Sequence, residues 1–206
     1  MLLYFNLWEK IKKSYFSFKE NVLFFVTFTV LVATLQISRS LFLKFMPSGF
    51  FLLLALLFSI FNGILSLNYI KSVLEIVDEK EAQIKDLFAY DKRFFEWMIY
   101  HLLFSLMLAI SLLCFIFPIF IVIPRFCLSD FYFVQGYGPI ESLKKSWIAT
   151  RGLAVSQYFS YWFLNFLGLI SFITVVGAVL SPSLFILAKG ILYKELQGKN
   201  LDSTNI

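Results

Sequence analysis

Four polar residues within long apolar stretches are the first candidates for chemistry: Arg125, Asp130, Asn165 and Lys189. A charge inside a membrane-spanning segment costs about 3 kcal/mol on insertion scales, and such charges commonly mark ion or substrate paths. An amide such as Asn165 more often joins two helices through a hydrogen bond. Two hypotheses follow. In the favoured one these side chains pair inside the protein, and in the other they line a transport or ligand site.

Motifs for catalysis or cofactor binding are absent from the sequence. The chain has one histidine, His101, and two cysteines, Cys114 and Cys127, all in apolar surroundings. It contains no glycine-rich phosphate loop, no Gly-x-Ser-x-Gly elbow, no Cys-x-x-Cys pair and no His-Glu-x-x-His zinc motif. The acids at 78–86 alternate with lysines, which is typical of a solvated surface. We therefore expect no enzymatic activity, no catalytic residue, no metal and no cofactor.

The composition places the protein in a lipid bilayer. Of its 206 residues, 60% are hydrophobic, 20% are aromatic and only 15% are charged. A soluble domain has about a quarter of its residues charged, and a chain of this size could not bury so much apolar surface in one core. The composition thus excludes an ordinary soluble domain, a disordered protein and a nucleic-acid-binding module. The bilayer itself is the first expected partner.

Six apolar segments are expected to cross the membrane as helices, since a crossing needs about 20 residues. They are Val22–Ile37, Phe50–Ile70, Phe94–Phe117, Pro118–Val134, Leu153–Thr174 and about Ala178–Leu196. Pro118 and Pro124 interrupt the longest apolar stretch, and proline breaks helical hydrogen bonding, so the chain should turn near Pro118. Without that turn the number of spans falls to five. The predicted fold is an all-α polytopic bundle of about six transmembrane helices, alternatively five.

Short amphipathic helices are expected at the membrane surface beside this bundle. One covers residues 1–20, a second covers Ile140–Thr150, and a further helical piece lies in the charged loop Lys71–Arg93. The whole chain then forms one integral membrane domain. The bundle covers 21–196, and a polar tail covers 197–206.

The distribution of lysine and arginine predicts the orientation of the chain, because these residues accumulate in cytoplasmic loops. With six spans and a cytoplasmic N-terminus, Arg39 and Lys44 are the only two of 18 basic residues that fall outside. Arg125 and Lys189 fall within spans. Five spans would instead place the basic residues of 144–151 outside. We therefore expect both termini in the cytoplasm.

A basic cluster at the Ile140–Thr150 helix is a candidate contact for anionic lipid headgroups. Its members are Lys144, Lys145, Trp147 and Arg151. Each basic residue near an anionic membrane surface contributes about 1 kcal/mol of attraction. The same charges also serve to set topology, and neither role excludes the other.

Helical geometry predicts an ion pair between Asp130 and Lys189. With six spans, the helices that carry them both run inward, and the two residues lie about 17 Å from the outer boundary at about 1.5 Å per residue. Arg125 lies about 140° around the helix from Asp130 and is not the expected partner. The pair would join the fourth span to the sixth.

Several stretches of the C-terminal half form a pattern: FYFV at 131–134, GYGPIESLKKSWIATRG at 136–152, Ser181-Pro182, and LAKGILYKEL at 187–196. This pattern resembles the membrane domain of some glycerophosphodiester phosphodiesterases and of related free-standing bacterial integral membrane proteins. Those phosphodiesterases carry a separate soluble catalytic domain, whereas this chain ends soon after its last apolar segment. The resemblance therefore implies a stand-alone membrane protein of the bacterial inner membrane, without the enzyme.

The sequence thus predicts a multi-pass membrane protein with an accessory, scaffold or envelope-homeostasis role. The alternative is a small transporter or a lipid-handling permease. A transporter would have a water-accessible cavity lined by Arg125, Asp130 or Asn165, whereas a scaffold would have these groups paired in a closed bundle. The sequence names no protein partner, and it is compatible with a homo-oligomer.

Overall fold

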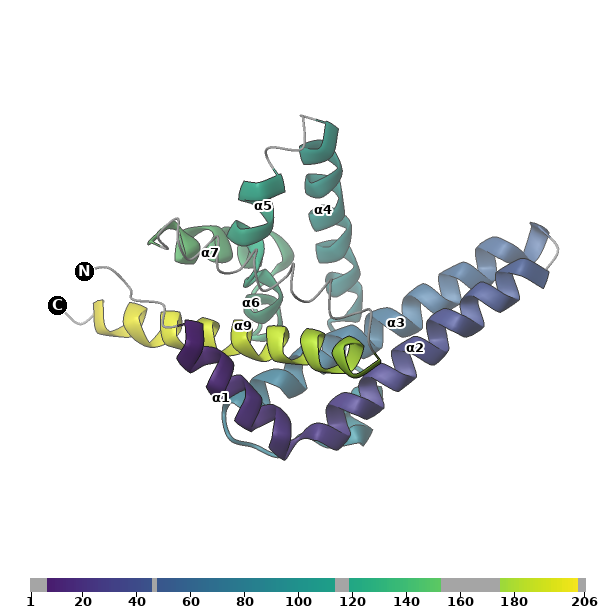
Figure 1. Cartoon of the computed structure of the whole chain (residues 1–206). Helices are drawn as coiled ribbons and strands as arrows, with labels where there is room; N and C mark the ends of the chain where they lie inside the picture. The colour runs from purple at the N-terminus through teal and green to yellow at the C-terminus, as the bar shows by residue number, and fades with distance from the viewer. Residues whose placement is uncertain (1–6, 46–47, 114–118, 153–174, 204–206) are drawn as a thin grey trace.

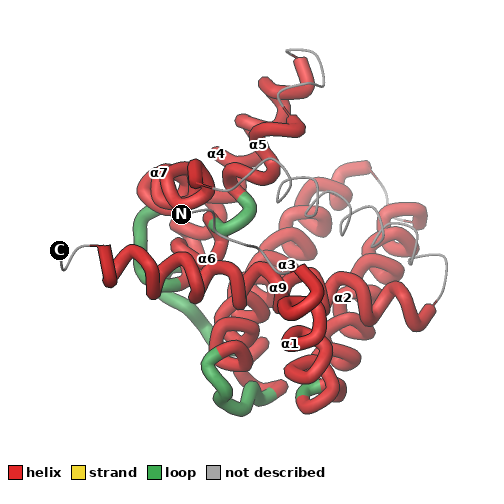
Figure 2. The backbone as a smooth tube through the Cα atoms, turned by 60° about the vertical axis from the view of Figure 1, so that its left-hand side comes forward, coloured by secondary structure: helices red, strands yellow, loops and turns green. Residues whose placement is uncertain are grey.

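The protein is helical throughout the computed structural model, which describes residues 7–45, 48–113, 119–152 and 175–203. Its α-helices are α1 (Leu7–Glu20), α2 (Val22–Phe45), α3 (Ser48–Val77), α4 (Phe94–Leu113), α5 (Ile119–Phe126), α6 (Ser129–Val134), α7 (Pro139–Ala149) and α9 (Val175–Ser203). The described residues also form two 3₁₀ helices, η1 (Ile84–Phe88) and η2 (Thr150–Gly152). No strand occurs in these described ranges (Figure 2). The predicted all-α class is confirmed.

Among the described residues, three helices are long enough and apolar enough to cross a membrane. These segments are Val22–Phe42, Leu53–Val77 and Phe94–Leu112, within α2, α3 and α4. Only 11%, 28% and 17% of the residues in their apolar windows are buried inside the protein, so most of their apolar side chains face outward. An apolar surface of this extent is suited to lipid and not to water. The protein is therefore a helical membrane protein, and the first three predicted spans are confirmed as candidates.

Several serine and threonine hydroxyls on these apolar helices donate to a carbonyl of their own helix. Thr29 donates to the carbonyl of Phe25 at 2.9 Å, and Ser59 donates to the carbonyl of Ala55 at 2.8 Å. Hydrocarbon offers no other partner for a polar group, so this return contact lets the helices carry hydroxyls toward lipid.

The helices meet at two close crossings (Figure 1). α2 and α3 form a long hairpin, α4 leaves the middle of α3 steeply, and α9 crosses α3 and packs against α1. Gly63 permits the α3–α4 contact, because a Cβ there would lie 3.2 Å from the ring of Phe94. Gly190 does the same between α9 and α3, where a Cβ would lie 3.1 Å from Cγ2 of Val77.

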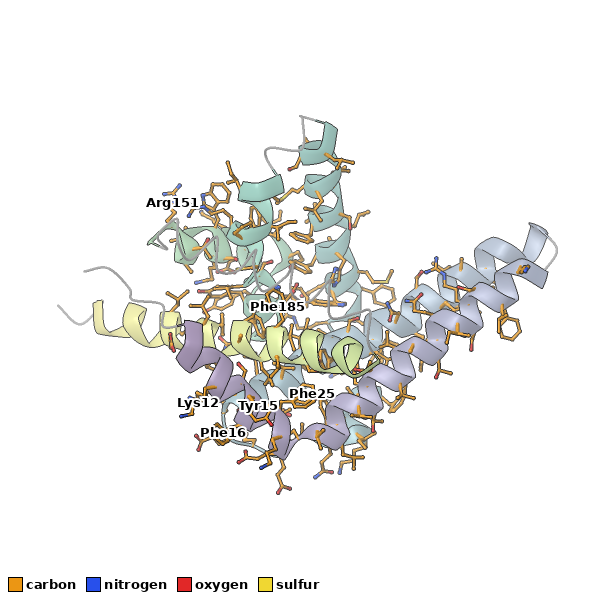
Figure 3. The ribbon with its side chains drawn as sticks, viewed as in Figure 1. Lys12, Tyr15, Phe16, Phe25, Arg151 and Phe185 are labelled. Atoms are coloured by element: carbon orange, nitrogen blue, oxygen red, sulfur yellow. The ribbon has the colours of Figure 1, made fainter. Side chains whose placement is uncertain are left out.

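Aromatic side chains fill the core between these helices. The rings of Phe28 and Tyr69 stack at 3.7 Å between α2 and α3, and those of Tyr132 and Tyr193 meet edge to face at 4.7 Å between α6 and α9. Aromatic pairs contribute about 0.5–1.5 kcal/mol beyond the area that they bury. Phe25 is fully buried where α1 and α2 meet (Figure 3).

The predicted fourth span, Pro118–Val134, is not one continuous helix. α5 packs beside α4 and runs back along it, but it ends at Phe126, and α6 begins at Ser129 (Figure 1). Pro124 lies in the last turn of α5, where its missing N–H and its ring weaken helical bonding. The turn itself, expected near Pro118, lies outside the described residues.

The remaining predicted spans are not confirmed. The fifth, Leu153–Thr174, lies outside the described residues. The sixth corresponds to α9, which continues past the predicted end at Leu196 to Ser203, so that much of the predicted tail 197–206 is helical. A total of about six spans stays a prediction.

The two short amphipathic helices expected from the sequence are present as α1 and α7. α7 begins at Pro139, whose fixed φ suits the first helical turn, after Gly138 in an extended conformation. The loop predicted at Lys71–Arg93 is shorter than expected, because α3 continues to Val77. Its helical piece is η1, whose Leu87 is fully buried.

Candidate functional site

Asp130 is bonded to a buried tyrosine. The hydroxyl of Tyr100 donates to Oδ1 of Asp130 at 2.6 Å and lies 2.6 Å from Oγ of Ser129. Tyr100 is 1% exposed, so these contacts are shielded from solvent. They join α4 to α6 and give the predicted intramembrane carboxylate a partner.

The predicted ion pair between Asp130 and Lys189 is not formed. The ammonium of Lys189 lies 4.4 Å from the centroid of the Phe185 ring on its own helix, and the described residues show no ion pair between the two charges. The prediction assumed two continuous parallel helices, but α6 is a short separate helix whose carboxylate meets Tyr100 instead. Asn165, the fourth candidate, lies outside the described residues.

α7 packs against the end of α5 through contacts with Arg125. Its guanidinium carbon lies 5.3 Å from the Trp147 ring, and its backbone carbonyl accepts hydrogen bonds from Ser146 at 2.8 Å and from Thr150 at 3.1 Å. The last carbonyls of a helix have no hydrogen-bond donor within that helix, and here the two hydroxyls are the donors to the Arg125 carbonyl. This role of Arg125 was not predicted from the sequence. Its available signal was two hydroxyls spaced four residues apart, on one face of a helix.

The predicted headgroup cluster is divided between the surface and the interior. Lys144 and Arg151 are exposed, and Arg151 points away from the helices (Figure 3). The ammonium of Lys145 lies 4.2 Å from the centroid of the Tyr137 ring, and Trp147 packs against α5. Two of the four residues are therefore exposed, and the other two pack against neighbouring aromatic rings.

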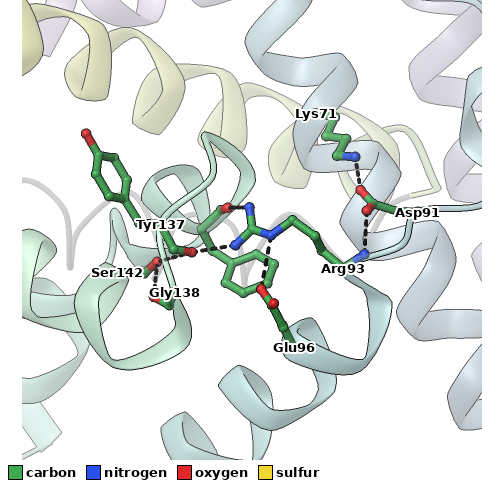
Figure 4. Close-up of polar contacts among 8 residues, drawn as sticks. Lys71, Asp91, Arg93, Glu96, Tyr137, Gly138 and Ser142 are labelled. Atoms are coloured by element: carbon green, nitrogen blue, oxygen red, sulfur yellow. Dashed lines mark hydrogen bonds and ion pairs between the residues drawn. The ribbon is translucent and has the colours of Figure 1, made fainter.

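Arg93 connects the start of α4 to the turn between α6 and α7 (Figure 4). Its guanidinium donates to the carbonyls of Phe133 at 2.7 Å and Tyr137 at 2.5 Å, and to the carboxylate of Glu96 at 3.1 Å. It also lies 4.3 Å from the centroid of the Phe133 ring. From the sequence, Arg93 was predicted only as one of the cytoplasmic charges that set topology.

Asp91 ties the same region to α3. Its carboxylate accepts from the ammonium of Lys71 and, at 2.7 Å, from the backbone N–H of Arg93 (Figure 4). Nearby, Asn68 of α3 donates to two carbonyls of the 87–89 segment, at 3.0 and 2.8 Å. The charged loop is therefore fastened to the helices on both sides.

α9 is joined to α6 and α3 by polar contacts. Gln135 accepts from the hydroxyl of Tyr193 and from the amide of Gln197, both at 2.5 Å. Lys194 donates to the carboxylate of Asp78 at 2.8 Å. The ends of α3 and α6 and the second half of α9 therefore lie on the same side of the molecule.

A cavity of about 250 Å³ lies among the three candidate spans, between α2, α3 and α4. Its described polar lining comprises Gln36, Arg39, Ser59, Asn62, Ser66, Trp97 and His101, and its other described lining comprises Leu35, Phe58, Gly63 and Met98. The predicted transport cavity would involve Arg125, Asp130 or Asn165. None of these three is among the described lining residues.

Trp97 gives this cavity its most unusual feature. The side chain is 1% exposed, and its indole N–H has no hydrogen-bond partner among the described residues. A buried donor without a partner costs about 1–3 kcal/mol. The His101 ring meets the Trp97 ring edge to face at 4.3 Å, so the polar groups from α4 are adjacent.

A wider groove of about 850 Å³ separates α1 from the end of α3. Lys12, Lys13 and Glu20 line it from α1, while Glu79 and Lys80 line it from the segment after α3. Lys12 lies on the outer side of α1 (Figure 3). The groove carries charges of both signs.

No protein-family model, curated protein or solved structure matches this chain. The resemblance to the membrane domain of glycerophosphodiester phosphodiesterases therefore stays a prediction. In the described part of the chain, no group of three or more His, Cys, Asp or Glu side chains could hold a metal ion.

Proposed function

We propose that the protein is a polytopic accessory or scaffold protein of a bacterial inner membrane, without enzymatic activity. The observation that carries this proposal is the set of partners around the predicted intramembrane charges. Asp130 accepts from Tyr100, Lys189 lies over Phe185, and Arg125 lies beside the Trp147 ring. A scaffold needs such internal contacts, whereas a transporter needs these groups around water.

The proposed topology has six spans and both termini in the cytoplasm. The contact between Lys194 and Asp78 supports it, since the end of α3 and the second half of α9 would then share the cytoplasmic side. The basic residues of 10–19, 80–93 and 144–151 would lie there too, as cytoplasmic loops favour them.

Contact with anionic phospholipid headgroups is proposed for the outer face of α7. Lys144 and Arg151 are exposed there, beside the exposed apolar side chains Ile140 and Ile148. A helix with apolar and basic residues outward is suited to the membrane interface. Ile140 is 72% exposed and so adds to this apolar outer surface.

The resemblance in the C-terminal half supports a stand-alone membrane domain and an envelope-homeostasis role. Its SWIAT segment supplies the Ser146 and Thr150 contacts that dock α7 on α5. Packing thus accounts for this part of the pattern, in agreement with a non-enzymatic role.

The experiment that tests the accessory role is recovery of the tagged chain from native membranes into lipid nanodiscs, followed by mass spectrometry of proteins and lipids. We expect one membrane protein in near-stoichiometric amount and an enrichment of anionic lipid. Charge reversal at Lys144→Glu and Arg151→Glu should remove the lipid enrichment, while Lys92→Glu, at another exposed lysine, should not. Absence of a stoichiometric partner, together with solute flux in proteoliposomes, would overturn the proposal.

A lipid-handling permease is the second candidate function. The polar cavity among α2, α3 and α4 favours it, because a permease needs a polar site within its spans.

A further inference from the structure

The cavity among α2, α3 and α4 combines polar groups from three candidate spans. Gln36 and Arg39 come from α2, Ser59 and Asn62 from α3, and Trp97 and His101 from α4. A polar site in apolar surroundings needs an occupant that satisfies its hydrogen bonds.

The indole of Trp97 shows which type of group is missing. It can only donate, it is buried, and it has no acceptor among the described residues. Asn62 and His101 line the same cavity, and each of them can also donate. These donors suit a ligand with acceptor oxygens.

The charge of the lining shows the sign of the ligand. Arg39 is positive, no Asp or Glu is among the described lining residues, and none of the ion pairs between described residues includes Arg39. Arg39 lies near the end of the Val22–Phe42 candidate span, where a cation without a carboxylate beside it attracts an anion. An arginine beside neutral donors is the usual recognition set for phosphate or carboxylate.

The size and surroundings of the cavity favour a ligand with an apolar part. A volume of about 250 Å³ holds a phosphate or carboxylate with a small linker, since a water molecule in the liquid takes about 30 Å³. Leu35, Phe58 and Met98 line its apolar side. The neighbouring Leu102 is 70% exposed on α4, so a chain leaving the cavity meets apolar surface.

We infer that this cavity binds the anionic phosphate or carboxylate headgroup of a membrane amphiphile, with Arg39, Asn62 and the indole N–H of Trp97 as ligands. The acyl chain would lie along the outward apolar faces of the helices. Such a site serves a scaffold and a permease alike.

Thermal unfolding of the purified protein in a neutral maltoside detergent tests this inference. Dioctanoyl phosphatidic acid and oleate should raise the unfolding temperature saturably, and neutral dioctanoylglycerol should not. Equal stabilisation by inorganic phosphate would overturn the amphiphile and assign the same site to a soluble anion. Equal stabilisation by dioctanoylglycerol would overturn the anion site.

Variants locate the site. Arg39→Gln and Trp97→Phe should each weaken apparent affinity by at least about tenfold, as expected for the loss of a charge-assisted or buried hydrogen bond. Arg39→Lys should retain most of the affinity because it keeps the charge. Lys44→Gln, at an exposed lysine of the same helix outside the cavity, should bind like the unaltered chain. Unchanged binding in folded Arg39→Gln would overturn the inference.

Discussion

Asp130 and Lys189 have separate partners, Tyr100 and Phe185, and their contributions to stability should therefore be independent. We predict that the effects of Asp130→Asn and Lys189→Met on the free energy of unfolding add to within about 0.5 kcal/mol. Tyr100→Phe and Asp130→Asn share a hydrogen bond and should show a coupling energy of about 0.5–3 kcal/mol. Denaturant unfolding in detergent micelles measures both cycles. If the Asp130→Asn, Lys189→Met double variant were more stable than the single variants, the result would instead support a direct ion pair between Asp130 and Lys189.

Arg93 makes contacts that lysine cannot reproduce, because its planar guanidinium reaches two carbonyls and a carboxylate together. Arg93→Lys should lower the free energy of unfolding by about 1–3 kcal/mol, since it leaves at least one carbonyl without its donor. Cleavage of the 136–138 turn by added protease should also become faster. Lys92→Met, at the exposed neighbouring residue, is the matched control. Equal stability of the Arg93→Lys and Lys92→Met variants would contradict the role assigned to Arg93.

The sequence indicates which polar residues need a partner more readily than it indicates which residue the partner is. The need of Asp130 for a partner follows from its apolar surroundings, but the choice of Tyr100 depends on where α4 meets α6. Trp97 and Asn62 were not predicted as lining one cavity, because α3 and α4 are joined by a loop whose path the sequence does not specify.

At the scale of elements, the crossing of α9 over α3 depends on Gly190. An added Cβ would lie 3.1 Å from Cγ2 of Val77 and 3.6 Å from the Phe131 ring, so a larger side chain has to displace these neighbours. Gly190→Val should destabilise the protein by about 1–3 kcal/mol, the usual cost of overpacking. Gly138→Ala serves as the control, since nothing lies within 4 Å of its added Cβ. A Gly190→Val variant that unfolds at the same temperature as Gly138→Ala would show that the crossing is loose.

Long elements were predicted well and short ones less well, for a physical reason. The charge-free runs that became α2, α3 and α4 carry their own signal, because twenty apolar residues have few alternatives to a helix in lipid. Pro139 similarly marks the start of α7. The ends of α3 and α9 are set by packing and by contacts such as Lys194 with Asp78, which a one-dimensional pattern does not contain.

The arrangement of the whole molecule depends on contacts between distant segments. Asp78 with Lys194 and Gln135 with Tyr193 gather the ends of α3, α6 and α9 on one side. The start of α3 at Ser48 lies about 45 Å away along the helix axis, at about 1.5 Å per residue over its 30 residues. In the proposed topology these two regions fall on opposite sides of the bilayer.

Cysteine labelling in intact cells tests this membrane arrangement most directly. Single changes Ser48→Cys, Gln83→Cys and Ser203→Cys are introduced into a chain in which Cys114 and Cys127 are replaced by serine. A membrane-impermeant maleimide should label Ser48→Cys in intact cells, and should label Gln83→Cys and Ser203→Cys only after the membrane is opened. Labelling of Gln83→Cys or Ser203→Cys in intact cells, at the level of Ser48→Cys, would contradict the proposed arrangement.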